Sequence, residues 1–588
     1  MPLQPKLRQS LRSPVWIHAL LLAGWLAIAL AVRLHHLTLK PLWVDEVSTL
    51  VFSLGNSYRD IPLNQPMVAE ALLQPLRPNL QATLLDAVSH LLQESNHPPL
   101  YFALTHGWLH LFPAPQGYVS LAGARSLSVL WGVLTVPAVM ALGWAMFRSR
   151  TTAHLAAALM AVSPFGVYLA QEARHYTLAV LWIVASLAGL STAVYYLRHC
   201  RPLPRWMVAA WVGVNGLGLA THYFMALTLM AEAFTLLILR IWRRKWGWTA
   251  NRWRLGGAIA GTAITGLVWL PVWQSASQEN DLTRWIYESD LGGWGWIDPL
   301  LQTLASIVSM VYLLPVQRVE DTIAIASGLI LLGLTLWTLR IVWRGYRTQI
   351  NDPTSADGMT ILALFCLSAI AILLLLTYVK GIGLAQVFRY HMIYFPAVVI
   401  LVAAGIVGRW AFSPSPPPVR VPRPLSMPGL ARFRLSRDRV ILLIILLGLA
   451  GSLTVTNDFA YRKLHRPDRV VSEMAERLEA PVLVAISHQS HGQTGRLMAL
   501  AWEMRSPRYT SLLESSQFYL DHQDCDLLGE QNCSTPSAAL RQTLDQTPRP
   551  VDLWLLNYEG EANLTPQECR YVTTKRTDGY KYQQYQCR

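Results

Sequence analysis

The chain has 588 residues, of which 53% are hydrophobic and only 14% are charged, and its mean hydropathy is +0.30. Soluble proteins carry about 25% charged residues, so this composition excludes an ordinary soluble protein. Repeated apolar runs of about 20 residues indicate a polytopic membrane protein instead. The net charge of +14 does not indicate a nucleic-acid partner, because the basic residues cluster in short loops between apolar runs, as the positive-inside rule requires.

The first apolar run covers residues 15–34 and follows a polar, basic segment, residues 1–14, that contains Lys6, Arg8 and Arg12. Three positive charges before the run predict a cytoplasmic N-terminus. The run lacks a small-residue cleavage site and is expected to remain as an anchor. The outer loop 35–123 follows. Within it, residues 98–112 are too few to cross a 30 Å core comfortably, so we expect them to lie along the membrane surface; a short true span would invert the later topology.

The remaining apolar runs predict a polytopic α-helical protein with about 11 spans. A further apolar segment, 299–315, is bounded by prolines and is expected to form a surface or re-entrant helix. Residues 15–410 would form the transmembrane catalytic module, residues 411–438 a basic, proline-rich cytoplasmic linker, and residues 439–456 the last transmembrane helix. The predicted spans are 15–34, 124–147, 153–170, 177–197, 206–221, 225–242, 255–273, 322–343, 359–379, 391–408 and 440–456.

The C-terminal segment, residues 457–588, is polar and is expected outside the membrane as a small α/β domain. Residues 481–487 and 551–556 read as buried strands, and residues 495–504 as a helix. Four cysteines lie here, which fits disulfides in an oxidising compartment. Three pairings are possible, and we expect the near-neighbour pairs Cys525–Cys533 and Cys569–Cys587. No cysteine or histidine spacing indicates a structural zinc site.

The charged motifs all fall on the side of the membrane that carries this C-terminal segment. Asp45 and Glu46 come just after the first span, behind Pro41 and Trp43. Charges beside a bilayer are costly unless they are solvated or used. The sequence therefore predicts a carboxylate site at the outer membrane surface. The alternative for Asp45 is an N-cap of the helix that follows, a position where Asp is favoured.

Six short motifs in order over residues 15–410 resemble the GT-C glycosyltransferases, in particular the protein O-mannosyltransferase and aminoarabinose-transferase-like branch. Each motif alone is weak, but the ordered set is fairly specific. The motifs are Trp43-x-Asp45-Glu46; His97-Pro98-Pro99-Leu100-Tyr101 with Trp108; Arg125 through Gly132; Ser163-Pro164-Phe165; Gln171-Glu172-Ala173-Arg174-x-Tyr176; and Phe388-Arg389-Tyr390 followed by Pro396.

The resemblance implies that an acceptor hydroxyl or amine attacks C1 of a sugar on a polyprenyl phosphate. Such a reaction needs a base and cations around the leaving phosphate. The expected catalytic residues are Asp45 as base, Glu46 and Glu172. The expected phosphate-binding residues are Arg389, Arg174 and Lys380. The expected substrate-binding residues are His97, Tyr176, His222, Tyr223 and Tyr390. A divalent metal is possible, with Glu46, His97 and His222 as candidate ligands.

Purely structural roles are the alternative for several of these residues. Glu172 and Arg174 could form an interfacial ion pair, Lys380 could extend to the membrane surface, and the tyrosines could belong to the aromatic belt. Taken together, the sequence predicts an inverting glycosyltransferase of the plasma (inner) membrane. Its site and its C-terminal domain would lie on the extracytoplasmic side, with a polyprenyl-phosphate sugar and membrane lipid as partners and no nucleic acid. The alternatives are a transporter of lipid-linked glycans, which predicts charges near helix midpoints, and a non-catalytic membrane scaffold.

Overall fold

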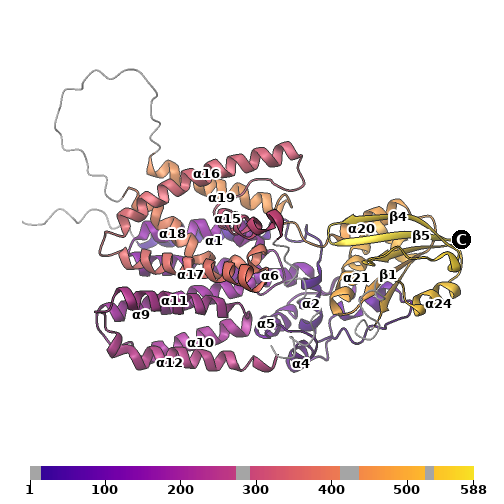
Figure 1. Cartoon of the computed structure of the whole chain (residues 1–588), viewed down its shortest axis with the longest axis horizontal. Helices are drawn as coiled ribbons and strands as arrows, with labels where there is room; N and C mark the ends of the chain where they lie inside the picture. The colour runs from indigo at the N-terminus through magenta and orange to yellow at the C-terminus, as the bar shows by residue number, and fades with distance from the viewer. Residues whose placement is uncertain (1–14, 273–291, 411–435, 524–534) are drawn as a thin grey trace, which may run out of the picture.

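The computed structural model describes residues 15–272, 292–410, 436–523 and 535–588. The molecule is elongated (Figure 1): a body of roughly aligned helices is followed by an α/β domain at one end, and short helices lie between the two. The helices of the body are α1 (Val15–Leu34), α6 (Leu121–Phe147), α7 (Arg150–Ala161), α8 (Pro164–Ala170), α9 (Tyr176–Arg198), α10 (Arg205–Thr221), α11 (Met225–Trp242), α12 (Trp248–Leu267), α15 (Asp298–Ser309), α16 (Asp321–Gln349), α17 (Ala356–Lys380), α18 (Phe395–Gly408) and α19 (Arg437–Thr456), with the 3₁₀ segments η4 (Gly293–Ile297), η5 (Leu384–Gln386) and η6 (Phe388–Ile393).

Seven of the described helices are long and apolar enough to cross a membrane, namely α1, α6, α9, α11, α16, α17 and α19. The pair α7 and α8, bent by 52°, makes an eighth if it counts as one span. The polytopic helical fold is thus confirmed, but the count is lower than the predicted 11. The other three predicted spans are helices α10, α12 and α18. Two of them are short, with 17 and 14 residues, and α12 is polar in its first turns, which contain Asn251, Arg252 and Arg254.

The bend between α7 and α8 is held by side chains. The last carbonyl groups of a helix have no partner within the helix. Arg33 of α1, fully buried, donates from Nη1 to the carbonyl oxygen of Ala161 (2.8 Å) and from Nη2 to that of Met160 (3.0 Å). Ser163 caps α8 by accepting from the backbone N–H of Gly166 at 3.1 Å. The break between the two helices therefore leaves few backbone groups without a hydrogen-bond partner.

The segment between α1 and α6 forms short helices. Of the two predicted surface segments, 98–112 contains α5 with ten residues and 299–315 contains part of α15 with twelve. At 1.5 Å per residue they are about 15 and 18 Å long, so neither crosses a 30 Å core alone. The segment between α1 and α6 contains α2 (Val44–Ser53), α3 (Ala69–Leu72), η1 (Gln74–Leu76), α4 (Leu84–Glu94), α5 (Leu100–Leu109) and η2 (Pro115–Gly117).

The C-terminal domain contains a mixed sheet of five strands in the order β2-β1-β3-β5-β4. Strand β1 pairs in parallel with β2 and β3, whereas β5 pairs antiparallel with β3 and β4. The two predicted strands and the predicted helix are confirmed as β1, β3 and α21. The elements are α20 (Pro467–Glu476), β1 (Val482–His488), α21 (His491–Met504), η7 (Pro507–Tyr509), α22 (Thr510–Glu514), β2 (Ser516–His522), α24 (Ala538–Gln546), β3 (Val551–Leu556), η9 (Thr565–Gln567), β4 (Cys569–Thr577) and β5 (Tyr580–Cys587).

The C-terminal domain shares a hydrophobic core with the short helices, as the position of α2 beside α21 in Figure 1 suggests. Val47 and Leu50 of α2 belong to the same buried cluster as Leu497 of α21. A β-bridge joins Met67 to Phe518 of β2. Burial of this continuous apolar surface holds the domain in a fixed place over α2.

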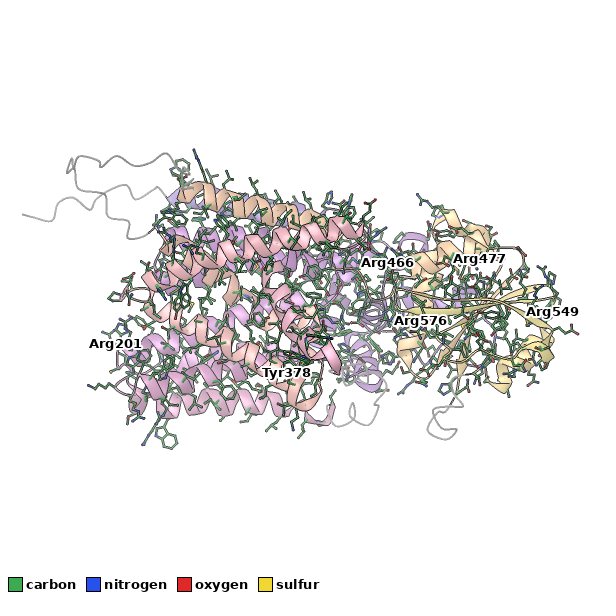
Figure 2. The ribbon with its side chains drawn as sticks, turned by 45° about the horizontal axis from the view of Figure 1, so that its top comes forward. Arg201, Tyr378, Arg466, Arg477, Arg549 and Arg576 are labelled. Atoms are coloured by element: carbon green, nitrogen blue, oxygen red, sulfur yellow. A yellow bond between two sulfur atoms is a disulfide. The ribbon has the colours of Figure 1, made fainter. Side chains whose placement is uncertain are left out.

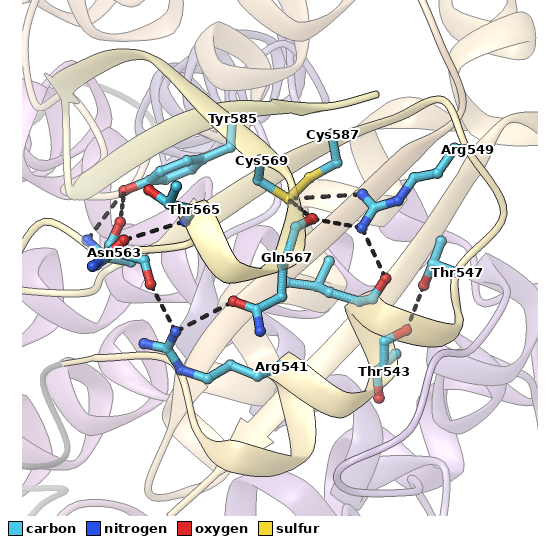
Figure 3. Close-up of a disulfide and its surroundings, with 12 residues drawn as sticks. Arg541, Thr543, Thr547, Arg549, Asn563, Thr565, Gln567, Cys569, Tyr585 and Cys587 are labelled. Atoms are coloured by element: carbon cyan, nitrogen blue, oxygen red, sulfur yellow. Dashed lines mark hydrogen bonds between the residues drawn. A yellow bond between two sulfur atoms is a disulfide. The ribbon is translucent and has the colours of Figure 1, made fainter.

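The predicted pair Cys569–Cys587 forms a disulfide between the opposed ends of β4 and β5. Figure 3 shows it beside Arg549, which donates to the carbonyl oxygen of Gln567 at 2.7 Å. Cys525 and Cys533 lie outside the described residues. Cys200 and Cys366 are free.

Replacing Cys569 and Cys587 together by serine should lower the free energy of unfolding of the C-terminal domain. The disulfide closes a loop with a sequence separation of 18, for which loop-closure entropy gives about 3 kcal/mol. Denaturant unfolding of the purified protein measures the change. The control is Cys200→Ser, which removes an exposed free thiol; equal midpoints for the two variants would contradict the expectation.

Candidate active site

Helix α2 presents its two acidic residues in different directions. Its N-cap is Trp43, with φ −126° and ψ 165°, and the helix has no side-chain cap. Asp45 therefore lies in the first turn, and the alternative of an Asp45 N-cap is wrong. Successive residues of a helix point about 100° apart. As a result, Glu46 points into the protein, with a fully buried side chain, while the side chain of Asp45 remains 27% exposed.

Glu46 is held by Arg125 of α6. Arg125 donates from Nε to Oε1 and from Nη2 to Oε2 of Glu46, both at 2.8 Å, and the backbone N–H of Ala173 donates to Oε1 at 2.8 Å. Burial by itself would raise the pKa of Glu46, but Arg125, and behind it Lys463, hold that pKa below its ordinary value. The same Arg125 guanidinium also donates to the carbonyl oxygens of Leu37, Lys40 and Pro41. This arginine thus fixes the chain that leads from α1 into α2.

Arg125→Met should therefore destabilise the whole protein. It would leave Glu46 buried without its bidentate partner, and breaking a buried pair costs about 3–5 kcal/mol. Thermal unfolding in detergent, or the yield of inserted protein, measures the loss. The double change Arg125→Met with Glu46→Gln should recover part of it, because no charge is left without its partner; no recovery would contradict the pairing argument.

Asp45 lies between two buried arginines. Its Oδ2 is 3.7 Å from Nη2 of Arg174 and 3.9 Å from Nη2 of Arg389. Arg389 lies in η6, between α17 and α18, and its guanidinium packs over the rings of Trp43 (5.3 Å) and Tyr390 (5.4 Å). Three sequence motifs that are more than 100 positions apart thus meet at one carboxylate. Both separations exceed a hydrogen-bond length, so these arginines are near the carboxylate without being locked to it.

Arg174 is held by hydrogen bonds to groups other than the Asp45 carboxylate. Its Nη1 donates to the carbonyl oxygen of Asp45 (3.0 Å) and to Oγ1 of Thr49 (3.1 Å), and its Nη2 donates to Nε2 of His97 (2.9 Å). Because arginine only donates, Nε2 of His97 must accept, and the ring proton then lies on Nδ1, which donates to Oγ of Ser95 at 2.8 Å. Burial, and next to it the charge of Arg174, lower the pKa of His97 well below its ordinary value. His97 is a neutral partner of Arg174 here.

Aromatic rings and imidazoles line the site on the His97 side. His175, which was not among the predicted site residues, contacts the rings of Tyr176 (4.9 Å) and His222 (4.5 Å). The ring of Tyr390 meets that of Phe224 at 4.5 Å. Burial lowers the pKa values of His175 and His222 well below the ordinary value. These residues present neutral ring surfaces, whose faces suit a sugar ring.

Glu172 has a partner that the sequence did not indicate. Lys463, in the segment between α19 and α20, brings Nζ to 2.5 Å from Oε1 of Glu172 and to 3.7 Å from Oε2 of Glu46. It also lies 4.9 Å from the ring centre of Trp43. No local motif marks Lys463, because its partner Glu172 is 291 positions away.

The remaining predicted residues are Lys380 and Tyr223. Lys380 is exposed at the end of α17 and, within the described ranges, forms no ion pair with the acids of the site. Tyr223 contacts the ring of Trp269 at 6.2 Å. Of the three candidate metal ligands, Glu46 has both oxygens bound by Arg125, and His97 has both nitrogens bonded. In the described part of the chain, no group of three or more His, Cys, Asp or Glu side chains is placed to hold a metal ion.

Among the described residues, Glu46 is paired with Arg125 and Glu172 with Lys463, and both Arg174 and Arg389 lie within 4 Å of the Asp45 carboxylate. Two guanidinium groups in a partly dehydrated place favour an anion. Guanidinium groups match the oxygens of phosphate in particular. The arrangement can therefore hold a phosphate beside an accessible carboxylate.

No protein-family model and no curated protein matches this sequence. Solved structures do match its fold. ArnT from Cupriavidus metallidurans in the apo state aligns with a TM-score of 0.50 at 12% identity over 97% of this chain and 98% of that chain. The same protein bound to undecaprenyl phosphate aligns with a TM-score of 0.50 at 13% identity over the same shares. The archaeal oligosaccharyltransferase AglB from Archaeoglobus fulgidus, in complex with an inhibitory peptide and a dolichol-phosphate, aligns with a TM-score of 0.36 at 14% identity over 83% of this chain and 64% of that chain.

Proposed function

We propose that this chain, which has the GT-C glycosyltransferase fold of ArnT, is a membrane glycosyltransferase that moves a sugar from a polyprenyl phosphate to an extracytoplasmic acceptor. The acceptor is a hydroxyl or amine of a lipid, glycan or protein. The observation that carries the proposal is the position of Asp45. Its accessible carboxylate lies within 4 Å of two buried arginines that come from distant parts of the chain.

The proposed reaction is a single displacement with inversion at C1 of the sugar. The bond between C1 and the phosphate oxygen breaks as the acceptor oxygen or nitrogen bonds to C1. The acceptor proton passes to the Asp45 carboxylate, a role for which a base needs to be within hydrogen-bond reach. The lipid phosphate leaves with additional negative charge, which Arg174 and Arg389 stabilise. Glu46, Glu172 and His97 position these groups without touching the reacting atoms.

The polyprenyl-phosphate donor is supported by two independent points. The two buried guanidinium groups beside Asp45 suit a phosphate, and the fold matches ArnT in a structure that contains undecaprenyl phosphate. That lipid is the ligand of ArnT; for this chain it is the proposed class of leaving group. The rings of His175, Tyr176, His222 and Tyr390 would then bound the space for the sugar.

The extracytoplasmic location is supported by the charge distribution. Arg201, in a basic loop between α9 and α10, lies at the end of the helical body far from the C-terminal domain (Figure 2). Basic loops favour the cytoplasmic side, and the Cys569–Cys587 disulfide favours an oxidising compartment. Both observations support a position of the C-terminal domain, with the site next to it, outside the plasma membrane.

The test is transfer of a labelled sugar. The purified full-length protein in lipid vesicles is given a radiolabelled polyprenyl-phosphate sugar and a membrane extract as the source of acceptor. Label should leave the polyprenyl phosphate and enter an acceptor fraction, with release of free polyprenyl phosphate. If hexose, pentose and amino-pentose donors all stay intact in the presence of the extract, the proposed function is wrong.

A further inference from the structure

The short segment 457–466 joins α19 to the C-terminal domain and lies along the end of the helical body that faces this domain. We call it the strap. Backbone N–H groups of Val316 and Gln317 donate to the carbonyl oxygen of Phe459, at 3.3 and 3.0 Å. The ring of Tyr461 stacks on that of Tyr168 of α8, with centres 4.2 Å apart and planes 4° from parallel. The strap is thus attached to the membrane body along its length.

The two ends of the strap are also joined to each other. The carboxylate of Asp458 binds Arg318 and Arg466, each at 2.6 Å through Oδ2. Asp458 and Tyr461 have φ values of +62° and +54°, a left-handed backbone that non-glycine residues adopt only when the surroundings fix it. Arg466 lies at the junction between the helical body and the C-terminal domain in Figure 2. These contacts fix the backbone of the strap and therefore the direction of the side chains between Asp458 and Arg466.

One of those side chains, Lys463, enters the site. Its side chain is 3% exposed, and it forms its closest ion pair with the equally buried Glu172. Among the described residues it is the ion-pair partner of Glu172, whereas Glu46 also has Arg125. Without Lys463, the buried Glu172 would lose its ion-pair partner among the described residues, and the more distant Lys40 would be a remaining cation that acts on it. Proteins avoid a poorly compensated buried carboxylate by moving or protonating the group.

Lys463 also contacts the ring of Trp43, against which Arg389 packs. Lys463 and Arg389 both pack against the ring of Trp43, at 4.9 and 5.3 Å from its centre. Trp43 is the N-cap of α2, two residues before Asp45. A shift of this ring would move the beginning of α2 and the place where Arg389 rests. Lys463 thus contacts residues on both sides of Asp45 in the sequence, namely Trp43 and Glu46.

We infer that Lys463 is a positioning residue for the transfer reaction and that the strap, and with it the C-terminal domain, completes the active site. This inference rests on the proposed function and deepens it. Lys463 holds Glu172 and Trp43 so that Asp45 and Arg389 face the same substrate. The C-terminal domain is then part of the catalytic unit, not an independent module that the membrane body carries.

The experiment compares transfer by four full-length variants in vesicles with that of the wild type. Lys463→Met removes the charge and keeps the length of the side chain. It should lower kcat about 100-fold, the effect of a misplacement of about 1 Å, with the KM for the donor within threefold of the wild-type value. Lys463→Arg keeps the charge, and its kcat should be at least tenfold higher than that of Lys463→Met. Lys463→Gln, whose amide can still donate to Glu172, should lie between Met and Arg.

The matched control is Lys575→Met, which removes a half-exposed lysine from a surface pair with Glu473 at 3.0 Å and should change nothing. Unfolding temperatures are measured for every variant. If Lys463→Met does not fold, the kcat of Lys463→Gln decides. A folded Met or Gln variant with kcat within twofold of the wild type overturns the inference and leaves the proposed function intact. A raised KM with unchanged kcat also overturns it, since Lys463 would then bind the donor. A wild type that transfers no sugar overturns both.

Discussion

Replacing Asp45 by asparagine should lower the rate of sugar transfer about 1,000-fold, within the 10²- to 10⁴-fold range of a lost general base. The side chain keeps its size but can no longer accept the acceptor proton. Binding of undecaprenyl phosphate should not weaken, because Arg174 and Arg389, which lie 3.7 and 3.9 Å from the Asp45 carboxylate, keep their positive charge when the negative charge of Asp45 is removed. The measurements are kcat for labelled-sugar transfer and the lipid-phosphate affinity of the same preparation.

The control for this change is Asp60→Asn, on the same loop but exposed. It should transfer at the wild-type rate. The split between rate and binding separates the possible roles of Asp45. If Asp45→Asn loses rate and lipid-phosphate affinity together, the carboxylate organises the donor site instead of accepting a proton. If it loses neither, Asp45 has no part in the reaction.

Replacing Arg389 by methionine should lower kcat/KM about 10²- to 10³-fold, the effect of removing one preorganised group that stabilises transition-state charge. Arg389 is 6% exposed and lies against Trp43 and Tyr390, so little water can replace its charge. Arg389→Lys should recover little of the loss. A lysine has the charge but lacks the planar fork that matches two phosphate oxygens and stacks on rings.

The matched control is Arg576→Met, an exposed arginine of β4 that Figure 2 shows on the C-terminal domain. It should leave both kinetic constants unchanged. Undecaprenyl phosphate also serves as a competitive inhibitor here, and its inhibition constant should rise for Arg389→Met. A normal inhibition constant and normal kcat/KM for this variant would show that Arg389 does not meet the phosphate.

Local sequence determined much of the fold. Apolar runs of the right length must become helices in a bilayer, since each buried backbone group has to be bonded within its own segment, and every predicted span coincides with a described helix or the bent α7–α8 pair. Among the described residues, seven or eight helices are long and apolar enough to cross a membrane, against the predicted 11. The difference arises because α10 and α18 are short helices and α12 begins with polar turns. The continuous apolar runs of β1 and β3 were equally readable, since a strand buried on both faces needs them.

The strands β2, β4 and β5 were not predicted. Their sequences mix polar and aromatic residues, and β4 is largely exposed. Such strands form because neighbouring strands are already in place. The disulfide Cys569–Cys587 was predictable because two cysteines with a separation of 18 residues in a polar segment have few other partners.

The sequence by itself indicated which charged residues flank the apolar helices, because charge beside an apolar run is conspicuous. Asp45, Arg174 and Arg389 were all found in this way, and the structure brings both arginines within 4 Å of the Asp45 carboxylate. Only the tertiary structure decided their division of labour. Glu46 turns inward to Arg125 because of the helical twist of α2, and His97 becomes a neutral acceptor for Arg174 because both are buried together. Lys463 reaches Glu172 across 291 positions because long-range packing, which leaves no local pattern, places the strap over the site.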